Sequence, residues 1–195
     1  MKTLTTIALA ALFCFAGSAR AESTRSSTRN LRSSAREKLF LGLDGDFAVP
    51  VGNYSNVNGV GAGVLATAEY PVMPELSATA RIGFQYHANK NVLGFDTHAH
   101  SVPVLLGGKY YLMPGVDVRQ GLFAAAELGL FDVISGLSSR TVSNSSNDLR
   151  FGAGVGIGWA MKQWNARVNL HSHDVGHFGD ALMMTAGIGY QFAGI

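Results

Sequence analysis

Residues Leu182 to Phe192 read Leu-Met-Met-Thr-Ala-Gly-Ile-Gly-Tyr-Gln-Phe, and every second position from Leu182 onward is apolar. The intervening positions are mostly small or polar, among them Gly187, Gly189 and Gln191. Period-two alternation of this kind places two chemistries on opposite faces of one strand. Here one face carries the bulky apolar residues and ends in the aromatic residues Tyr190 and Phe192, and the opposite face carries the glycines. The combination is typical of a barrel that meets lipid outside and is narrow and polar inside.

Seven further segments upstream repeat this alternation, and none has a charged residue on its apolar parity. The absence is informative, because one Lys or Arg facing lipid costs roughly 2–4 kcal/mol near the membrane midplane. The sequence therefore predicts an all-β fold, an eight-stranded antiparallel up-and-down transmembrane β-barrel over residues 39–195. The eight predicted strands span residues 39–49, 60–70, 76–86, 102–112, 122–130, 151–161, 166–170 and 182–192.

The predicted links alternate in length along the chain. Residues 71–74, 113–120 and 162–165 form the shorter links, and residues 50–59, 88–97, 134–147 and 174–180 form the longer ones, which we expect to be external loops. Short turns on one side of the membrane and longer loops on the other are expected of outer-membrane barrels. Aromatic residues gather near the strand ends, and two such belts mark two membrane interfaces. Those near the short links are Phe40, Tyr70, Tyr110, Trp159, Tyr190 and Phe192, and those near the long links are Phe47, Phe84, Tyr86 and Phe151.

The start of the chain has the features of an export signal. A basic start at Lys2 precedes an apolar run over residues 4–17, and Ala19-Arg20-Ala21 is an A-x-A cleavage site. Residues 1–21 are therefore predicted to be a signal peptide that is cut after Ala21. The only cysteine, Cys14, lies within it, so we expect no disulfide in the mature chain. Residues 22–38 are rich in Ser, Thr and Arg without apolar periodicity, which predicts a flexible basic leader.

The charge balance gives no indication of a nucleic-acid partner. The formal charge of +2 comes from Lys2 and Arg20, and the chain after residue 21 balances at 13 basic and 13 acidic residues. No apolar run after the signal is long enough for a membrane-spanning helix. Because only helices and closed barrels satisfy their backbone groups in lipid, the composition also favours a barrel.

The last strand resembles the C-terminal sorting signal of bacterial outer-membrane proteins, with Thr185, Gly187, Tyr190 and Phe192 at the matching positions. With the export signal and eight strands, the mature chain resembles the small OmpA/OmpX-type family of outer-membrane barrels. The resemblance implies a monomer in contact with outer-membrane lipid and lipopolysaccharide, inserted by the outer-membrane assembly machinery, with both termini periplasmic. The resemblance says little about activity, and we expect a structural or surface-interaction role through the loops, with neither catalysis nor a cofactor. The chain departs from the family pattern by continuing through residues 193–195.

The parity opposite to the apolar one holds the ionisable residues of the predicted strands. Eight strands leave an interior just wide enough for side chains, and an unpaired buried charge costs several kcal/mol. We therefore expect the charges to pair across the lumen and to close it. Counting along the strands predicts one layer of Asp44, Arg81 and Glu127 at mid-height, and a second of Glu69, Lys109 and Arg167 nearer the termini, with Arg150 also facing inward.

Histidines gather near the long links. The pairs His98/His100 and His171/His173 each place two imidazoles on one side of a strand, which is a workable half-site for zinc or copper. His87 is a fifth candidate ligand. Strict parity directs His98 and His100 outward and the other three inward, which opposes convergence. A wet polar rim that tolerates histidine explains the same pattern.

Two other functions remain open on the sequence alone. The stretch His171-Ser172-His173-Asp174 offers a nucleophile, a base and an orienting acid, as in a lipid-A-modifying barrel, although Ser172 lies on the opposite strand face from its neighbours. A soluble, lipocalin-like periplasmic carrier of a small apolar ligand is compatible with the same alternation if the bulky parity faces inward. The inward glycines, the aromatic belts and the C-terminal pattern favour the membrane barrel.

Overall fold

The computed structural model describes residues 38–195 except 93–94, 113–118, 139–142 and 193, so the predicted signal peptide and all but Lys38 of the leader lie outside the described residues. Two short helical segments are present, α3 (Tyr54–Val57) and the 3-10 helix η1 (Val175–Asp180). The strands are β1 (Phe40–Pro50), β2 (Gly61–Pro71), β3 (Leu76–His87), β4 (Lys90–Val92), β5 (Phe95–Tyr111), β6 (Gly121–Ser138), β7 (Ser143–Met161), β8 (Trp164–Ser172) and β9 (Leu182–Gln191).

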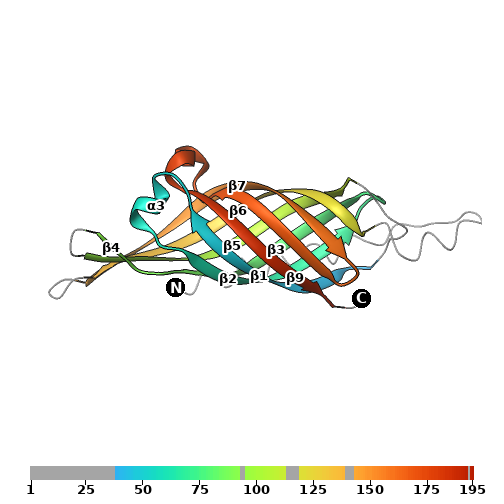
Figure 1. Ribbon diagram of the computed structural model, residues 1–195, viewed down its shortest axis with the longest axis horizontal. Coiled ribbons are helices and arrows are strands. Elements are labelled where there is room, and N and C mark those ends of the chain that lie inside the picture. The colour runs from blue at the N-terminus through green and yellow to red at the C-terminus, as the bar shows by residue number, and fades with distance from the viewer. Residues whose placement is uncertain (1–37, 93–94, 113–118, 139–142, 193) are drawn as a thin grey trace, which may run out of the picture. The chain divides into compact units, whose positions relative to one another are not determined.

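All strands except the short β4 form a closed eight-stranded antiparallel barrel (Figure 1). Each of the eight pairs with its neighbours in chain order, and β3 pairs directly with β5. The pairing of β1 with β9, in which Asp44 lies opposite Gly189, closes the circle. The predicted fold class is therefore confirmed.

No helix in the described part of the chain is long and apolar enough to cross a membrane.

The barrel has two distinct ends. We call the end that carries α3, β4 and η1 the loop end, and the opposite end, where the described termini lie, the turn end (Figure 1). At the turn end the backbones of Leu39 and Ile195 exchange two hydrogen bonds of 3.1 and 3.0 Å. The end of the chain thus continues the pairing of β1 with β9.

The prediction of a long loop at residues 134–147 is wrong, because β6 and β7 continue as a paired hairpin to Ser138 and Ser143. Backbone pairing satisfies the peptide groups whatever the side chains, and the hydroxyls of Ser135 and Ser146 lie 3.1 Å apart across the hairpin. The partner strand β8 reaches only as far as Ala153 of β7. The hairpin therefore projects beyond the barrel at the loop end.

The bulky apolar parity faces outward, as predicted for a lipid-facing surface. Leu43, Val64 and Ile157 are 46, 60 and 62 % exposed, whereas Arg81 and Glu69 are 5 and 3 % exposed. A lipocalin-like barrel requires the reverse arrangement, with bulky apolar groups inside. The soluble-carrier alternative therefore does not match the observed sidedness.

Large apolar side chains also lie inside the barrel, a feature that was not predicted from the sequence. Phe123 packs with Tyr111 and Ala160, and Phe131 packs with Leu105 and Val133. The glycines of β7 make room for the two phenyl rings: a Cβ on Gly158 would collide with Phe123, and one on Gly152 with Phe131. The interior is therefore filled by rings as well as by charged groups.

Candidate functional site

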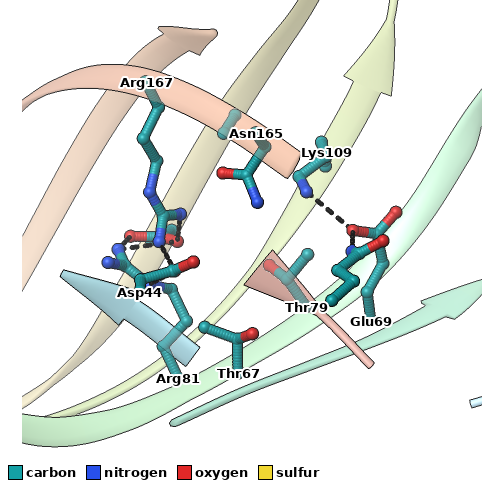
Figure 2. Close-up of a pocket in the computed structure, with 11 residues that line it drawn as sticks. Asp44, Thr67, Glu69, Thr79, Arg81, Lys109, Asn165 and Arg167 are labelled. Carbon is teal, nitrogen blue, oxygen red and sulfur yellow. Dashed lines mark hydrogen bonds and ion pairs between the residues drawn. The ribbon is translucent and has the colours of Figure 1, made fainter. Parts of the chain in front are cut away.

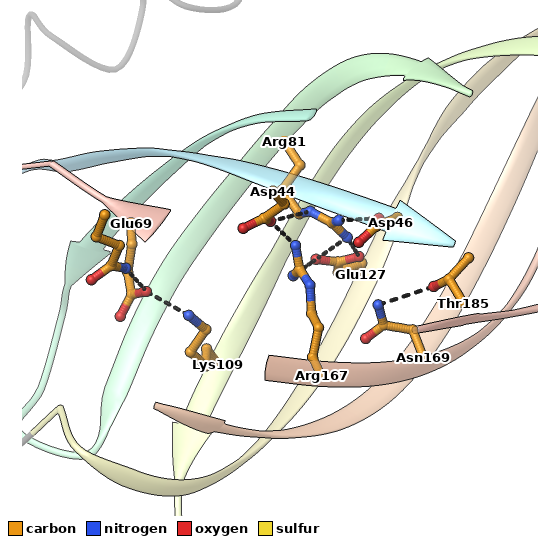
Figure 3. A network of polar contacts seen from close by, with 10 residues as sticks. Asp44, Asp46, Glu69, Arg81, Lys109, Glu127, Arg167, Asn169 and Thr185 are labelled. Carbon is orange, nitrogen blue, oxygen red and sulfur yellow. Dashed lines mark hydrogen bonds and ion pairs between the residues drawn. The ribbon is translucent and has the colours of Figure 1, made fainter. Parts of the chain in front are cut away.

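A central ion cluster lies inside the barrel between β1, β3, β6 and β8 (Figure 3). The guanidinium of Arg81 is its hub. Its Nη2 lies 2.7 Å from Asp46 Oδ2, its Nη1 3.0 Å from Glu127 Oε2, and its Nε 3.3 Å from Asp44 Oδ2. Arg167 contacts Asp44 and lies 3.7 Å from Glu127 Oε1. Three carboxylates thus share two guanidinium groups, so the cluster carries one surplus negative charge.

A second ion pair lies nearer the turn end. Lys109 Nζ donates to Glu69 Oε2 at 2.6 Å, and the hydroxyl of Tyr111 donates to the other oxygen at 2.9 Å. Gln191 adds a third donor at 2.8 Å, so the carboxylate of Glu69 is fully bonded. The Lys109 ammonium also lies 4.7 Å from the centre of the Phe123 ring, within the range of a cation–π contact.

Both charge sets line a small polar cavity (Figure 2). The cavity volume is about 20 Å³, which is room for on the order of one water molecule. Asn165, Thr67 and Thr79 complete its wall with neutral polar groups. A cavity of this size has no room for an apolar ligand.

Two predicted positions within the charge set differ from the structure. Arg167 was expected beside Glu69 and Lys109, but it pairs with the central ion cluster instead. The predicted levels hold only for straight strands, whereas strands in a closed barrel are tilted and staggered. Arg150 also lies apart from both sets, because it pairs with Asp148 near the projecting hairpin, where their side chains are 36 and 53 % exposed.

A histidine cluster fills the barrel at the loop end; it consists of Tyr54, His87, Phe131, His171 and His173. Phe131 stacks on His173 at 4.4 Å and on His171 at 5.8 Å between ring centres. Tyr54 meets His87 and His173 edge to face at 6.2 and 5.6 Å. All five side chains are buried.

The five candidate metal ligands do not assemble into one site. His100 stacks on Tyr86 at 4.8 Å on the outer face, away from the histidine cluster, and the side chain of His98 lies outside the described residues. Among the side chains that the structure describes, no three His, Cys, Asp or Glu groups come together in a way that could hold a metal ion. The three inward histidines are therefore not arranged as metal ligands.

The stretch around Ser172 is not arranged as a catalytic relay. The hydroxyl of Ser172 bonds the backbone of Asp174, and neither ring nitrogen of His173 has a hydrogen-bond partner. The carboxylate of Asp174 instead caps η1 by accepting from the backbone N–H groups of Gly176 and His177. The residue types needed for acyl transfer are adjacent in the chain, but the bonds that would couple them are used elsewhere.

Two loop-end segments close over the histidine cluster. Tyr54 of α3 is 7 % exposed and packs with Ala48 and Met183 inside the barrel mouth. Asn53 donates to the carboxylate of Asp180 at 2.8 Å, which ties α3 to η1. Tyr54 was not predicted from the sequence, because the link over residues 50–59 has no periodicity that would direct one of its side chains into the lumen.

No protein-family model and no curated protein matches the sequence. Solved structures do resemble the barrel. The attachment invasion locus protein Ail of Yersinia pestis is 13 % identical with a TM-score of 0.53, and its complex with the heparin analogue sucrose octasulfate is 13 % identical with a TM-score of 0.52. Each alignment covers 80 % of this chain and 97 % of the other. Neisserial surface protein A is 12 % identical, with 79 and 97 % coverage and a TM-score of 0.48. The chain thus has the fold of the small eight-stranded outer-membrane barrels exemplified by Ail.

Proposed function

We propose that this chain is an integral outer-membrane protein, a barrel whose lumen is closed by ion-paired side chains and whose loop end contacts external partners. The observation that carries the proposal is the sidedness of the strands. Large apolar side chains are exposed around the barrel, whereas the charged residues buried inside it are Asp44, Asp46, Glu69, Arg81, Lys109 and Arg167. A soluble protein rarely exposes a continuous apolar surface of this extent, whereas a membrane barrel requires one.

Exposed aromatic residues support two membrane interfaces. Tyr110, Trp159 and Trp164 lie near the turn end, and Phe84 and Phe151 lie towards the loop end. Aromatic side chains are enriched at the headgroup level, and Trp and Tyr suit it because each has an apolar ring and a polar group that can bond to water. The apolar band between these belts is the part of the barrel that we place in the hydrocarbon.

Closure of the lumen rests on the central ion cluster and the Glu69–Lys109 pair. Both lie across the barrel interior, and the cavity beside them holds on the order of one water. A hydrated ion or a small solute would have to displace bonded charged groups to pass. We expect no steady ion conductance when the purified barrel is inserted in a planar bilayer.

We expect the expressed full-length chain to fractionate with the outer membrane and to migrate faster on a gel before boiling than after it. Folded barrels resist detergent and stay compact until heated, so boiling should shift the band. The measurement is a fractionation followed by gels of boiled and unboiled samples. A chain recovered in the soluble periplasmic fraction without a heat-dependent shift would contradict the proposal.

The projecting β6–β7 hairpin favours a contact role at the loop end. Residues 143–152 of β7 pair with β6 on one side only, and no described strand covers their other edge. An open edge can accept an extended segment of another protein through main-chain hydrogen bonds. Ail, which has the same fold at low identity, is named for attachment and invasion. We infer that this edge is the contact surface.

Replacing residues 135–146 with an Asn-Gly turn should abolish attachment while leaving the barrel folded. The removed residues pair with each other and, on the β6 side, with residues 96–99 of β5, all beyond the point where β8 ends, so we expect the free energy of unfolding to fall by only about 1 kcal/mol. Cells displaying the full or the shortened chain would be compared on protein-coated surfaces, with gel migration as the folding control. Equal attachment by both would exclude the hairpin as the contact surface.

A further inference from the structure

Three imidazoles of the histidine cluster are buried, and each has at least one ring nitrogen without a hydrogen-bond partner; Nδ1 of His87 lies 3.3 Å from the Gly59 carbonyl oxygen. The Nε2 atoms of His87 and His171 and both ring nitrogens of His173 have no hydrogen-bond partner. His87 and His173 are no more than 1 % exposed, and His171 is 9 % exposed. Buried polar atoms without partners are uncommon and mark strain or a functional role. A neutral imidazole tolerates this environment far better than a charged one.

The charged groups that act on these imidazoles from the neighbouring strands are cationic or titrate to a cation. Arg81 and Arg167 act on His171, and Arg150 acts on His173. The three histidines also act on one another, and His100 of β5 acts on His87. β6 and β9 contribute the uncharged side chains of Phe131 and Met183.

The carboxylates of the surrounding segments bond to groups other than the three imidazoles. Asp46 of β1 pairs with Arg81 through Oδ2 while its Oδ1 has no hydrogen-bond partner, Asp174 caps η1, and Asp180 accepts from Asn53. His177 lies 3.4 Å from a carboxylate oxygen of Asp174, but it lies outside the cluster on the exposed η1, and none of His87, His171 and His173 has a described carboxylate within ion-pair distance. A proton added to one of these three imidazoles would therefore have no carboxylate of the described residues within ion-pair distance.

Tyr54 is the side chain that shields two of these imidazoles from the loop end, and it reaches them from a four-residue helix. Burial raises the pKa of Tyr54 to about 12, so its hydroxyl stays neutral at any physiological pH. The segment is tied to η1 by one side-chain hydrogen bond, from Asn53 to Asp180. A short segment held by few contacts can open without unfolding the barrel.

We propose that α3 with Tyr54 is a proton-sensitive cap over the histidine cluster, closed while the three imidazoles are neutral and released when they become charged. Acidification places positive charges near Arg81, Arg150 and Arg167, on imidazoles that have no described carboxylate within ion-pair distance. Lifting the cap admits water and separates the charges from the apolar rings. The loop end of the barrel then presents a different surface at acidic and at neutral pH.

The sign of the pH effect follows from the environment of His173, which lies just beyond the end of β8. Burial holds the pKa of His173 well below its usual range while the cap is closed. Once the cap opens, water reaches the ring and its pKa returns towards about 6.5. The closed form therefore keeps its full stability above about pH 6.5 and loses it as the pH falls below that value. Each imidazole that charges on opening raises the opening constant by up to about tenfold per pH unit.

The test measures opening through a thiol placed under the cap. Ala48→Cys introduces a small thiol that is fully buried beside Tyr54, and Asn56→Cys introduces an exposed one on α3. Each variant of the full barrel, refolded in lipid nanodiscs with a chelator present, would be labelled with 4,4′-dithiodipyridine. We expect the labelling rate of the Ala48→Cys variant, relative to that of the Asn56→Cys variant, to rise at least about tenfold from pH 7.5 to pH 5.0.

Histidine variants identify the groups that respond. His173→Gln and His87→Gln, each combined with Ala48→Cys, should flatten the pH dependence, whereas His177→Gln on the exposed η1 should leave it unchanged. Unboiled gels at each pH report whether the barrel itself remains folded. A rate ratio that does not change with pH would overturn the proposal. So would an undiminished rise in a variant in which all three cluster histidines are glutamine, or a rise that accompanies loss of the folded band.

Discussion

Replacing Arg81 with leucine is expected to lower the free energy of unfolding of the barrel by about 3–5 kcal/mol, the range for removing one partner of a buried ion pair. Arg81 bonds Asp46 and Glu127 and also lies 3.3 Å from Asp44. Leucine would leave three buried carboxylates with Arg167 as their only cation. The cost arises mainly from these unpaired negative charges and only in part from the lost contacts.

The measurement is urea-induced unfolding in detergent or lipid vesicles, followed by the fluorescence of Trp159 and Trp164. Arg150→Leu is the matched control, because Arg150 makes a single ion pair with Asp148 that is partly open to solvent. An exposed pair contributes only about 0–1 kcal/mol, so this variant should unfold almost as the parent does. Similar free energies of unfolding for the two leucine variants would show that the central ion cluster does not stabilise the folded barrel.

Much of the fold was predictable, because alternation is a strictly local property. Whether Leu43 faces lipid and Asp44 faces the lumen depends only on parity, which a closed barrel preserves along every strand. The hairpin of β6 and β7 was not predictable by the same means. Its serine-rich arms have no apolar parity, yet they pair from Ser135 with Ser146 to Ser138 with Ser143. Backbone pairing alone extends those strands.

The candidate sites were predictable to a smaller extent. Parity placed Arg81 and Glu127 inside, but the level of Arg167 depends on the stagger between strands, which no single segment records. The contact between Arg167 and Asp44 joins residues 123 positions apart. The position of Tyr54 could not be predicted from parity at all, because this residue belongs to a link without periodicity. Its place over the histidine cluster follows from how α3 packs on the barrel mouth.

The interior therefore combines two kinds of packing with different responses to the environment. Towards the turn end, charges are paired and fully bonded, as with Glu69 and its three donors. At the loop end, rings and neutral imidazoles pack without polar partners around His173. Paired charges resist moderate changes of pH, whereas unpaired imidazoles do not. We therefore expect the barrel wall to keep its structure when the pH changes and the loop end to change its conformation.

Val155→Arg should destabilise the barrel in phospholipid vesicles by about 2–4 kcal/mol, the cost of a lipid-facing arginine near the bilayer midplane. Val155 lies on the outward face of β7, midway between Phe151 and Trp159, and is 61 % exposed. It lies on the turn side of Phe151, which we assign to the belt nearer the loop end. In a bilayer its side chain would therefore face hydrocarbon, where a guanidinium has no partner.

Leu149→Arg is the matched control, because Leu149 is on the same face of the same strand and is 58 % exposed. It lies beyond Phe151, in the projecting hairpin, where a lipid-facing or water-facing arginine costs roughly 0–1 kcal/mol. The comparison is made by urea unfolding of both variants in vesicles of one lipid composition. Because the two positions have nearly equal exposure without a membrane, only contact with hydrocarbon separates their expected stabilities. Equal and small effects at both positions would mean that water surrounds the barrel along its whole length.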